Sequence, residues 1–147
     1  MLRKLDEGSL LVFYAGLRGW DYECSPALYL IGFFEVARAG LAKSFSPAEQ
    51  VHLFENNFHV MHRDVFADQK DRLVLVKGTA NSRLLKKAVK ISARGTDKSG
   101  HPLHRLAPEM QRIFGDFAGH TSIQRCPPRW VAREFIESAA QFVSSLR

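Results

Sequence analysis

The sequence predicts an α+β domain: a small curved β-barrel or strongly bent sheet with helices on its flank. Three observations predict it. Short apolar runs are typical of buried strands, a clear helix start follows the second run, and strands and helices do not alternate as they would in a doubly wound sheet. With 147 residues and 46% hydrophobic content, the chain suits one compact domain. We therefore expect a single domain over residues 1–147.

Two apolar and aromatic runs predict the first strands. Ser9–Leu17 ends in a Gly-rich turn and indicates a buried strand, and Ala27–Ala37 indicates a second. Gly32 lies in the middle of the second run. Because glycine weakens a strand unless something needs its missing side chain, we expect a bulge or a close backbone approach there.

A helix start follows at Ser46-Pro47-Ala48-Glu49, which has the form of a capping box with proline at the first helical position. We expect this helix to run from Pro47 to about Arg63. An apolar stripe should face the core: Val51, Phe54, Phe58, Met61 and Val65. A polar stripe shares one opposite face of the helix: His52, Asn56, His59 and Arg63.

The second half of the chain predicts a strand at Arg72–Val76 and a short helix at Asn81–Val89, with Asn81 or Ser82 as its N-cap. Ala93–Arg105 is rich in Gly, Lys and His, which indicates a mobile surface loop. The remaining segments predict a helix, a last strand and a final helix, at Ala107–Phe114, Ser122–Arg125 and Arg129–Leu146.

Positive charge is concentrated between Arg72 and Arg105. This window holds nine Lys or Arg residues and one acid, Asp97, so its charge is +8 in a chain of formal charge +6. A local basic patch favours a surface that meets a polyanion, most often nucleic acid. A solvated helix face followed by a charged loop would have the same composition.

Other classes of protein are disfavoured. The apolar runs are shorter than the roughly 20 residues that span a bilayer, and the N-terminus lacks the features of a signal peptide, so we expect a cytoplasmic protein and no membrane partner. Cys24 and Cys126 lie far apart and form no Cys-x-x-Cys pair. Neither a disulfide nor a metal site is indicated, and the sequence implies no cofactor.

The segment Lys77–Arg83 is the best candidate for a phosphate site. It joins a predicted strand to a predicted helix N-terminus, where free N–H groups and the helix dipole favour an anion. Lys77, Ser82 and Arg83 would add an ammonium, a hydroxyl and a guanidinium. Non-specific attraction would come from Lys86, Lys87 and Arg94. An ordinary turn with its own N-cap is the alternative.

A base-binding cleft is the second candidate site. Aromatic side chains of the first strands and their loop, among them Tyr14 and Trp20, are suited to stack an unpaired base. The polar stripe with Asn56 and His59 could hold a base edge or a phosphate, although a solvated helix face would look the same. The sequence contains no catalytic elbow motif and no recognised metal-ligand spacing.

Two pairs of motifs resemble known families. Val12-Phe13-Tyr14-Ala15 with the later run Leu30–Val36 resembles the PUA-like superfamily, which includes the ASCH and EVE groups. Lys77-Gly78 with the following run Ser82–Val89 resembles the prokaryotic and phage nucleotide-modification-associated domains linked to DNA base hypermodification. Together these matches cover about Val12–Ser92.

The resemblance implies a curved PUA-like barrel that handles modified bases, more often as a reader than as a catalyst. It places Tyr14, Gly32 and Glu35 near the cleft and the loop with Lys77, Ser82 and Arg83 on an edge that binds the nucleic-acid backbone. The long helix that begins at Pro47 exceeds what a minimal PUA-like barrel needs.

The leading hypothesis is a nucleic-acid-binding domain that recognises a modified or flipped base in DNA or RNA. The alternative is an enzyme acting on a nucleotide or modified base, with catalytic residues taken from His59, Asn56, Arg63 and Glu35. A third hypothesis is an accessory protein whose basic edge binds an acidic partner. The oligomeric state is left open.

Overall fold

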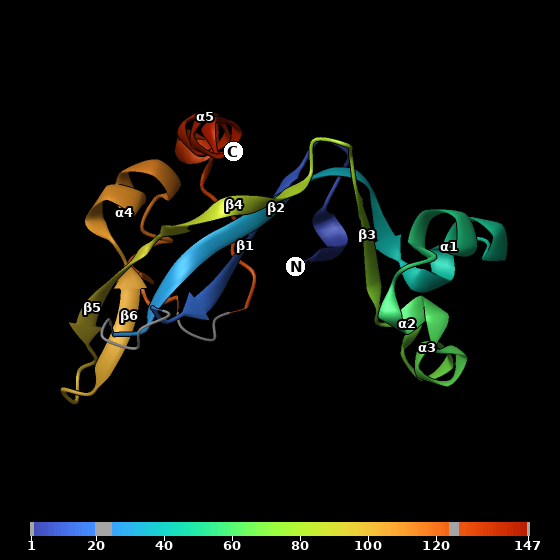
Figure 1. Cartoon of the computed structure of the whole chain (residues 1–147), viewed down its shortest axis with the longest axis horizontal. Coiled ribbons are helices and arrows are strands. Elements are labelled where there is room, and N and C mark those ends of the chain that lie inside the picture. The colour runs from blue at the N-terminus through green and yellow to red at the C-terminus, as the bar shows by residue number, and fades with distance from the viewer. Residues whose placement is uncertain (1, 20–24, 124–126, 147) are drawn as a thin grey trace. The chain divides into compact units, whose positions relative to one another are not determined.

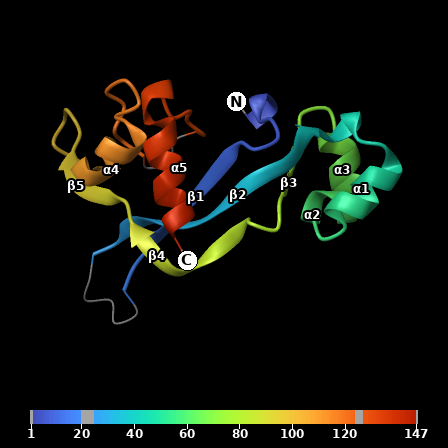
Figure 2. The same cartoon turned by 90° about the horizontal axis from the view of Figure 1, so that it is seen from above.

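The computed structural model describes residues 2–19, 25–123 and 127–146 (Figures 1 and 2). The chain divides into two compact units. Unit 1 comprises residues 1–11 and 34–82, and unit 2 comprises residues 12–33 and 83–147. The division falls within strands β1 (Leu10–Leu17) and β2 (Ala27–Leu41), so both strands contribute to both units.

Unit 1 is a pair of strands covered by short helices. Strand β3 (Val74–Gly78) pairs antiparallel with the C-terminal half of β2. The helices of unit 1 are α1 (Pro47–Phe54), α2 (Phe58–Met61) and α3 (Arg63–Gln69), with 3-10 turns at Leu2–Lys4 and Ala42–Ser44. Its core consists of Ala42, Phe45, Phe54 and Leu75, and the rings of Phe45 and Phe54 meet edge to face with centroids 5.2 Å apart.

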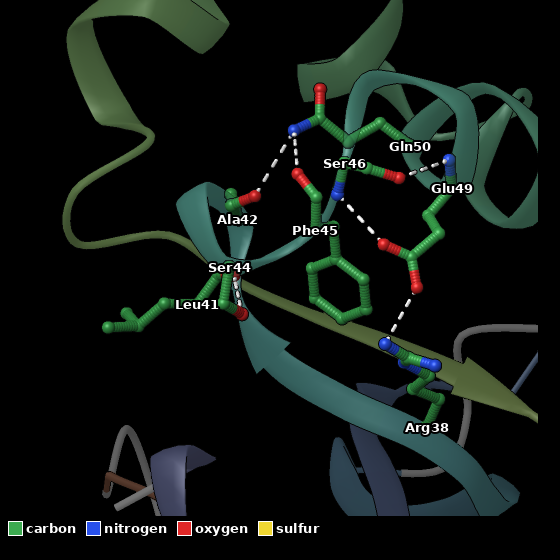
Figure 3. Close-up of polar contacts among 8 residues, drawn as sticks. All are labelled: Arg38, Leu41, Ala42, Ser44, Phe45, Ser46, Glu49 and Gln50. Carbon is green, nitrogen blue, oxygen red and sulfur yellow. Dashed lines mark hydrogen bonds and ion pairs between the residues drawn. The ribbon is translucent and has the colours of Figure 1, made fainter.

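The capped start of α1 is confirmed. The Ser46 hydroxyl accepts from the Glu49 N–H at 3.3 Å, and the Glu49 carboxylate accepts from the Ser46 N–H at 2.8 Å (Figure 3). The amide of Gln50 also donates to the carbonyls of Ala42 and Phe45, which fastens α1 to the preceding turn.

The prediction of one helix up to Arg63 is wrong. Helix α1 ends at Phe54, and the Asn57 side chain caps a new helix by accepting from the His59 N–H at 3.0 Å. The predicted apolar stripe does not face one core, because the break redirects the side chains that follow it and because Val51, which precedes the break, is exposed as well. Phe54 is 5% exposed, whereas Val51, Phe58 and Met61 are 65%, 61% and 62% exposed.

Unit 2 contains the N-terminal half of β2, paired antiparallel with β4 (Arg83–Lys90). Strands β5 (Ser92–Thr96) and β6 (Pro102–Leu106) form an antiparallel hairpin. Helices α4 (Pro108–Phe114) and α5 (Ile136–Ser145) pack on each other through the perpendicular rings of Phe114 and Phe142, 5.7 Å apart. A 3-10 turn at Arg133–Phe135 precedes α5.

Several predictions for unit 2 need correction. The segment Asn81–Val89 is not a helix, because from Arg83 onward it is strand β4, which pairs with β2 on either side of a bulge, and this tertiary pairing overrides its helical propensity. The expected loop Ala93–Arg105 is largely the β5–β6 hairpin. The final α-helix begins at Ile136 and not at Arg129. Ser122 forms an isolated bridge to Arg105, and residues 124–126 lie outside the described residues.

The α+β class is confirmed. One sheet has the order β1-β2-β3 with β4 also on β2, the other is the β5–β6 hairpin, and over the residues described neither sheet closes into a barrel. In the same part of the chain, no helix is long and apolar enough to cross a membrane.

Candidate functional site

The two units differ sharply in charge. Unit 2 holds 13 of the 21 Lys and Arg residues and seven of the 15 Asp and Glu residues, which gives a formal charge of +6. Unit 1 holds eight basic and eight acidic residues and is neutral. The whole net charge of the chain therefore belongs to unit 2, and a search for a polyanion-binding surface begins there.

Strand β4 makes a large bulge against β2. Leu30 pairs with Val89 and Gly32 pairs with Leu84, so between these pairs β2 has one residue and β4 has four. The predicted role of Gly32 is confirmed. A Cβ there would lie 2.7 Å from the Arg83 carbonyl oxygen, so β4 can approach β2 this closely only because Gly32 has no side chain. Bulges of this kind redirect side chains.

Three lysines of β4 lie in or just after this bulge. Lys86, Lys87 and Lys90 are exposed, and none forms an ion pair over the residues that the structure describes. Two arginines of the basic patch are engaged: the Arg83 guanidinium lies 5.6 Å from the centroid of the Phe33 ring, and Arg105 donates to the Thr96 carbonyl. Ammonium groups without an acidic partner keep their attraction for phosphates.

The predicted phosphate loop is fastened to Glu35 of β2. The Thr79 N–H donates to the Glu35 carbonyl at 2.7 Å, the Glu35 N–H donates to the Ser82 hydroxyl at 3.1 Å, and the Asn81 amide donates to the Glu35 carboxylate at 2.9 Å. A side chain at Gly78 would collide with Ser82. The loop is thus a structural corner between two strands, and because no helix follows it, the expected helix dipole is absent from this corner.

The cationic members of the predicted phosphate surface are divided between the units. Lys77 lies in unit 1, on the β3 position opposite Arg38 of β2. Arg83 begins β4 in unit 2, and Arg94 is exposed on β5 of the same unit. Within unit 2, the β4 bulge and the start of β5 carry most of the predicted contacts.

The predicted base pocket is also divided. Tyr14 lies in unit 2 with 36% exposure, and its hydroxyl donates to the Ile123 carbonyl at 2.7 Å. Trp20 lies outside the described residues. Glu35, Asn56 and His59 lie in unit 1.

The polar stripe does not form on one helix face. Asn56 is exposed in the turn after α1, His59 is half-buried on α2, and Arg63 begins α3. Over the described parts of the chain, no hydrogen bond or ion pair joins any two of these residues or links them to Glu35. No group of three or more potential metal ligands occurs in the same parts.

A groove of about 550 Å³ in unit 2 is a feature that the sequence did not predict. Its lining comes from β2, β4 and the C-terminal end of α5, which runs to β4 in Figure 2: Tyr29, Lys87, Ala88, Val89, Lys90, Ser145 and Leu146. One signal could have pointed to it, because Tyr29 carries the only polar side-chain group in the apolar run 27–34.

Comparison with known families adds a decisive observation. Residues 1–145 match the family model of nucleotide modification associated domain 3 (Nmad3). The chain belongs to this family. The match confirms the resemblance to nucleotide-modification-associated domains and links the Nmad3 chain to nucleotide modification. No curated protein and no solved structure matches it.

Proposed function

We propose that this Nmad3 domain binds nucleic acid and recognises a modified or flipped base, as a PUA-like reader in the cytoplasm. The observation that carries the proposal is the confinement of all net positive charge to unit 2, where three lysines of β4 have no acidic partner in the described chain. The family's association with nucleotide modification supports a modified nucleotide within DNA or RNA as the target that we propose.

The proposal assigns separate tasks to the two kinds of side chain. Arg83, Lys86, Lys87 and Arg94 would contact phosphates, which positions the strand without reading its sequence. Recognition of the base would depend on aromatic stacking and on hydrogen bonds to the base edge. Within unit 2, Tyr14 is the described aromatic residue that was predicted for this task; the predicted polar contacts Glu35, Asn56 and His59 belong to unit 1 and are not part of this site.

The test is a binding titration at several salt concentrations. Duplex and single-stranded oligonucleotides, each with and without a modified base, should bind at low salt. Their affinity should fall linearly on a log–log plot, with a slope of about −0.7 per phosphate contact for single strands. A modified base should raise affinity without changing the slope, because the base carries no phosphate. Failure of every oligonucleotide to bind at low salt would sink the proposal.

Catalysis is a separate outcome of the same experiments. Each oligonucleotide and free nucleotide is recovered after incubation and analysed by mass. If turnover is observed, and if His59→Ala abolishes it while the fold is retained, the domain is an enzyme acting on a nucleotide or modified base and not a reader. Recovery of unchanged material together with salt-dependent binding supports the reader.

A further inference from the structure

We infer that the groove between the β4 bulge and the end of α5 binds a single nucleotide, with its phosphate at Lys87 and Lys90 and its base against Tyr29. The inference rests on the proposed function and names the chemical unit that unit 2 would hold. The nucleotide could be a free nucleoside monophosphate or one unit of a strand, since both present the same phosphate and ring.

The groove is open to solvent and has room for this ligand. Its volume is about 550 Å³. The lining combines two ammonium groups with the apolar surfaces of Ala88, Val89 and Leu146. A nucleotide is complementary to this lining, because its phosphate is anionic and its base is a flat ring.

The strand register places the charge and the ring together. Tyr29 of β2 is the direct cross-strand partner of Lys90 on β4, and side chains of directly opposed residues lie on the same face of a sheet. Lys87 comes from the bulge, which redirects it from the regular alternation of the strand. One side of the groove therefore holds an aromatic ring beside two cations.

Three side chains in the groove, Tyr29, Lys87 and Lys90, have bonding capacity to offer a ligand. The Tyr29 hydroxyl has no hydrogen-bond partner within residues 2–19, 25–123 and 127–146, although tyrosine hydroxyls that are not fully exposed usually find one. Neither lysine forms an ion pair in those ranges. A phosphate and the polar edge of a nucleotide would supply the missing acceptors.

A competing explanation is that the lysines only offset the negative end of the α5 dipole. Some of the carbonyl groups at that end already accept hydrogen bonds from within the same segment. The Ser145 hydroxyl donates to the Phe142 carbonyl at 2.6 Å, and the Leu146 N–H donates to the Val143 carbonyl at 3.1 Å. Two of the last carbonyls of α5 therefore have donors without any lysine.

The experiment titrates the full chain with 5′-dCMP, deoxycytidine and inorganic phosphate by calorimetry at low salt. The nucleotide should bind at least about fivefold more tightly than either fragment, because stacking and charge act together. The double variant Lys87→Gln, Lys90→Gln should bind 5′-dCMP about tenfold or more weakly. Tyr29→Leu should lose about fivefold, whereas Tyr29→Phe should keep most of the stacking.

Lys98→Gln is the control for loss of charge outside the groove, because Lys98 is exposed in the β5–β6 turn of the same unit and does not line the groove. It removes one charge and should bind 5′-dCMP as the native chain does. Absence of 5′-dCMP binding overturns the inference. So does a double variant that melts at lower temperature but keeps its affinity, since the lysines would then serve only the end of α5.

A single-stranded oligonucleotide separates the two sources of the nucleotide. If Tyr29→Leu weakens both 5′-dCMP and the oligonucleotide, the groove holds a unit of the strand; if it weakens 5′-dCMP alone, the groove holds a free nucleotide. Salt-dependent binding of the oligonucleotide without any binding of 5′-dCMP rejects the groove and leaves the proposed function standing. Binding of 5′-dCMP without binding of any oligonucleotide rejects the proposed function and supports the groove as a site for a free nucleotide.

Discussion

Three of the eight Lys and Arg residues of unit 1 pair with acids, whereas the three lysines of β4 in unit 2 pair with none in the described chain. In unit 1, Arg38 pairs with Glu49 at 2.7 Å, Lys43 with Asp71 at 3.2 Å and Arg72 with Asp68 at 3.4 Å. In unit 2, the lysines of β4 have no acidic partner in the described chain. Exposed ion pairs add little stability, but they cancel the field that would attract a polyanion. A count of basic residues alone therefore does not locate an interface, because unpaired cations matter more.

The units also differ in how they are held together. Unit 1 combines the pairing of β2 with β3 with local capping and a small core around Leu75, whereas in unit 2 the pairing of β2 with β4 depends on the close approach at Gly32. Substitutions in these two places should affect different parts of the molecule.

The largest effect is expected for Leu75→Ala. Leu75 is 1% exposed, and removing a buried leucine side chain costs about 2–5 kcal/mol of unfolding free energy. Hydrogen exchange should show the greatest loss of protection in unit 1, because the affected core consists of residues of that unit. Equal loss in both units would show instead that they unfold as one domain.

A smaller effect on stability is expected for Gly32→Ala. Its Cβ would lie 2.7 Å from the Arg83 carbonyl oxygen, and backbone displacement of this kind costs about 1–3 kcal/mol. Gly16→Ala is the control, since a Cβ there would meet only the Leu28 side chain at 3.7 Å. Thermal melting and the exchange of β4 amides should distinguish the two variants; equal melting temperatures would contradict the close approach.

The difference in pairing between the units predicts a difference in salt dependence. Lys86→Gln with Lys87→Gln should reduce the slope for single-stranded oligonucleotides by about 1.4, which corresponds to about sevenfold less affinity lost between 50 and 200 mM salt. Arg38→Gln with Lys43→Gln removes the same charge from unit 1, where both cations are paired. An equal change of slope in both double variants would show that pairing does not decide which cations meet the nucleic acid.

The predictions that succeeded depended on local signals. Apolar runs located β1, β2 and β3, the capping box located the start of α1, and glycine in an apolar strand located the close approach at Gly32. Each of these signals acts within a few residues, so the sequence carries it directly.

The predictions that failed depended on contacts far apart in the chain or on a competing cap. Residues 84–88 have helical propensity, but the pairing of Leu84 and Val89 with β2 at the two ends of the bulge keeps this segment in a strand. Asn57 interrupts a periodic helical pattern because its side chain bonds the next backbone N–H groups. The groove was missed because Tyr29 and Lys90 are brought together only by the strand register.

The smallest effect is expected from pH, with one carboxylate in each unit. The Ser46 N–H lowers the pKa of Glu49 below its ordinary value of 4.5, with help from the Ser46 hydroxyl and Arg38, and the His101 N–H lowers the pKa of Asp97 below 3.8. A lowered pKa stabilises the folded state above the unfolded value, and this contribution is lost as pH falls through the folded value. Melting temperatures should therefore drop below about pH 4.5. Glu49→Gln should flatten the drop from about pH 4.5 downward, whereas Asp97→Asn should flatten it only below about pH 3.8. Identical pH profiles for both variants and the native chain would show that these hydrogen bonds do not bias either carboxylate.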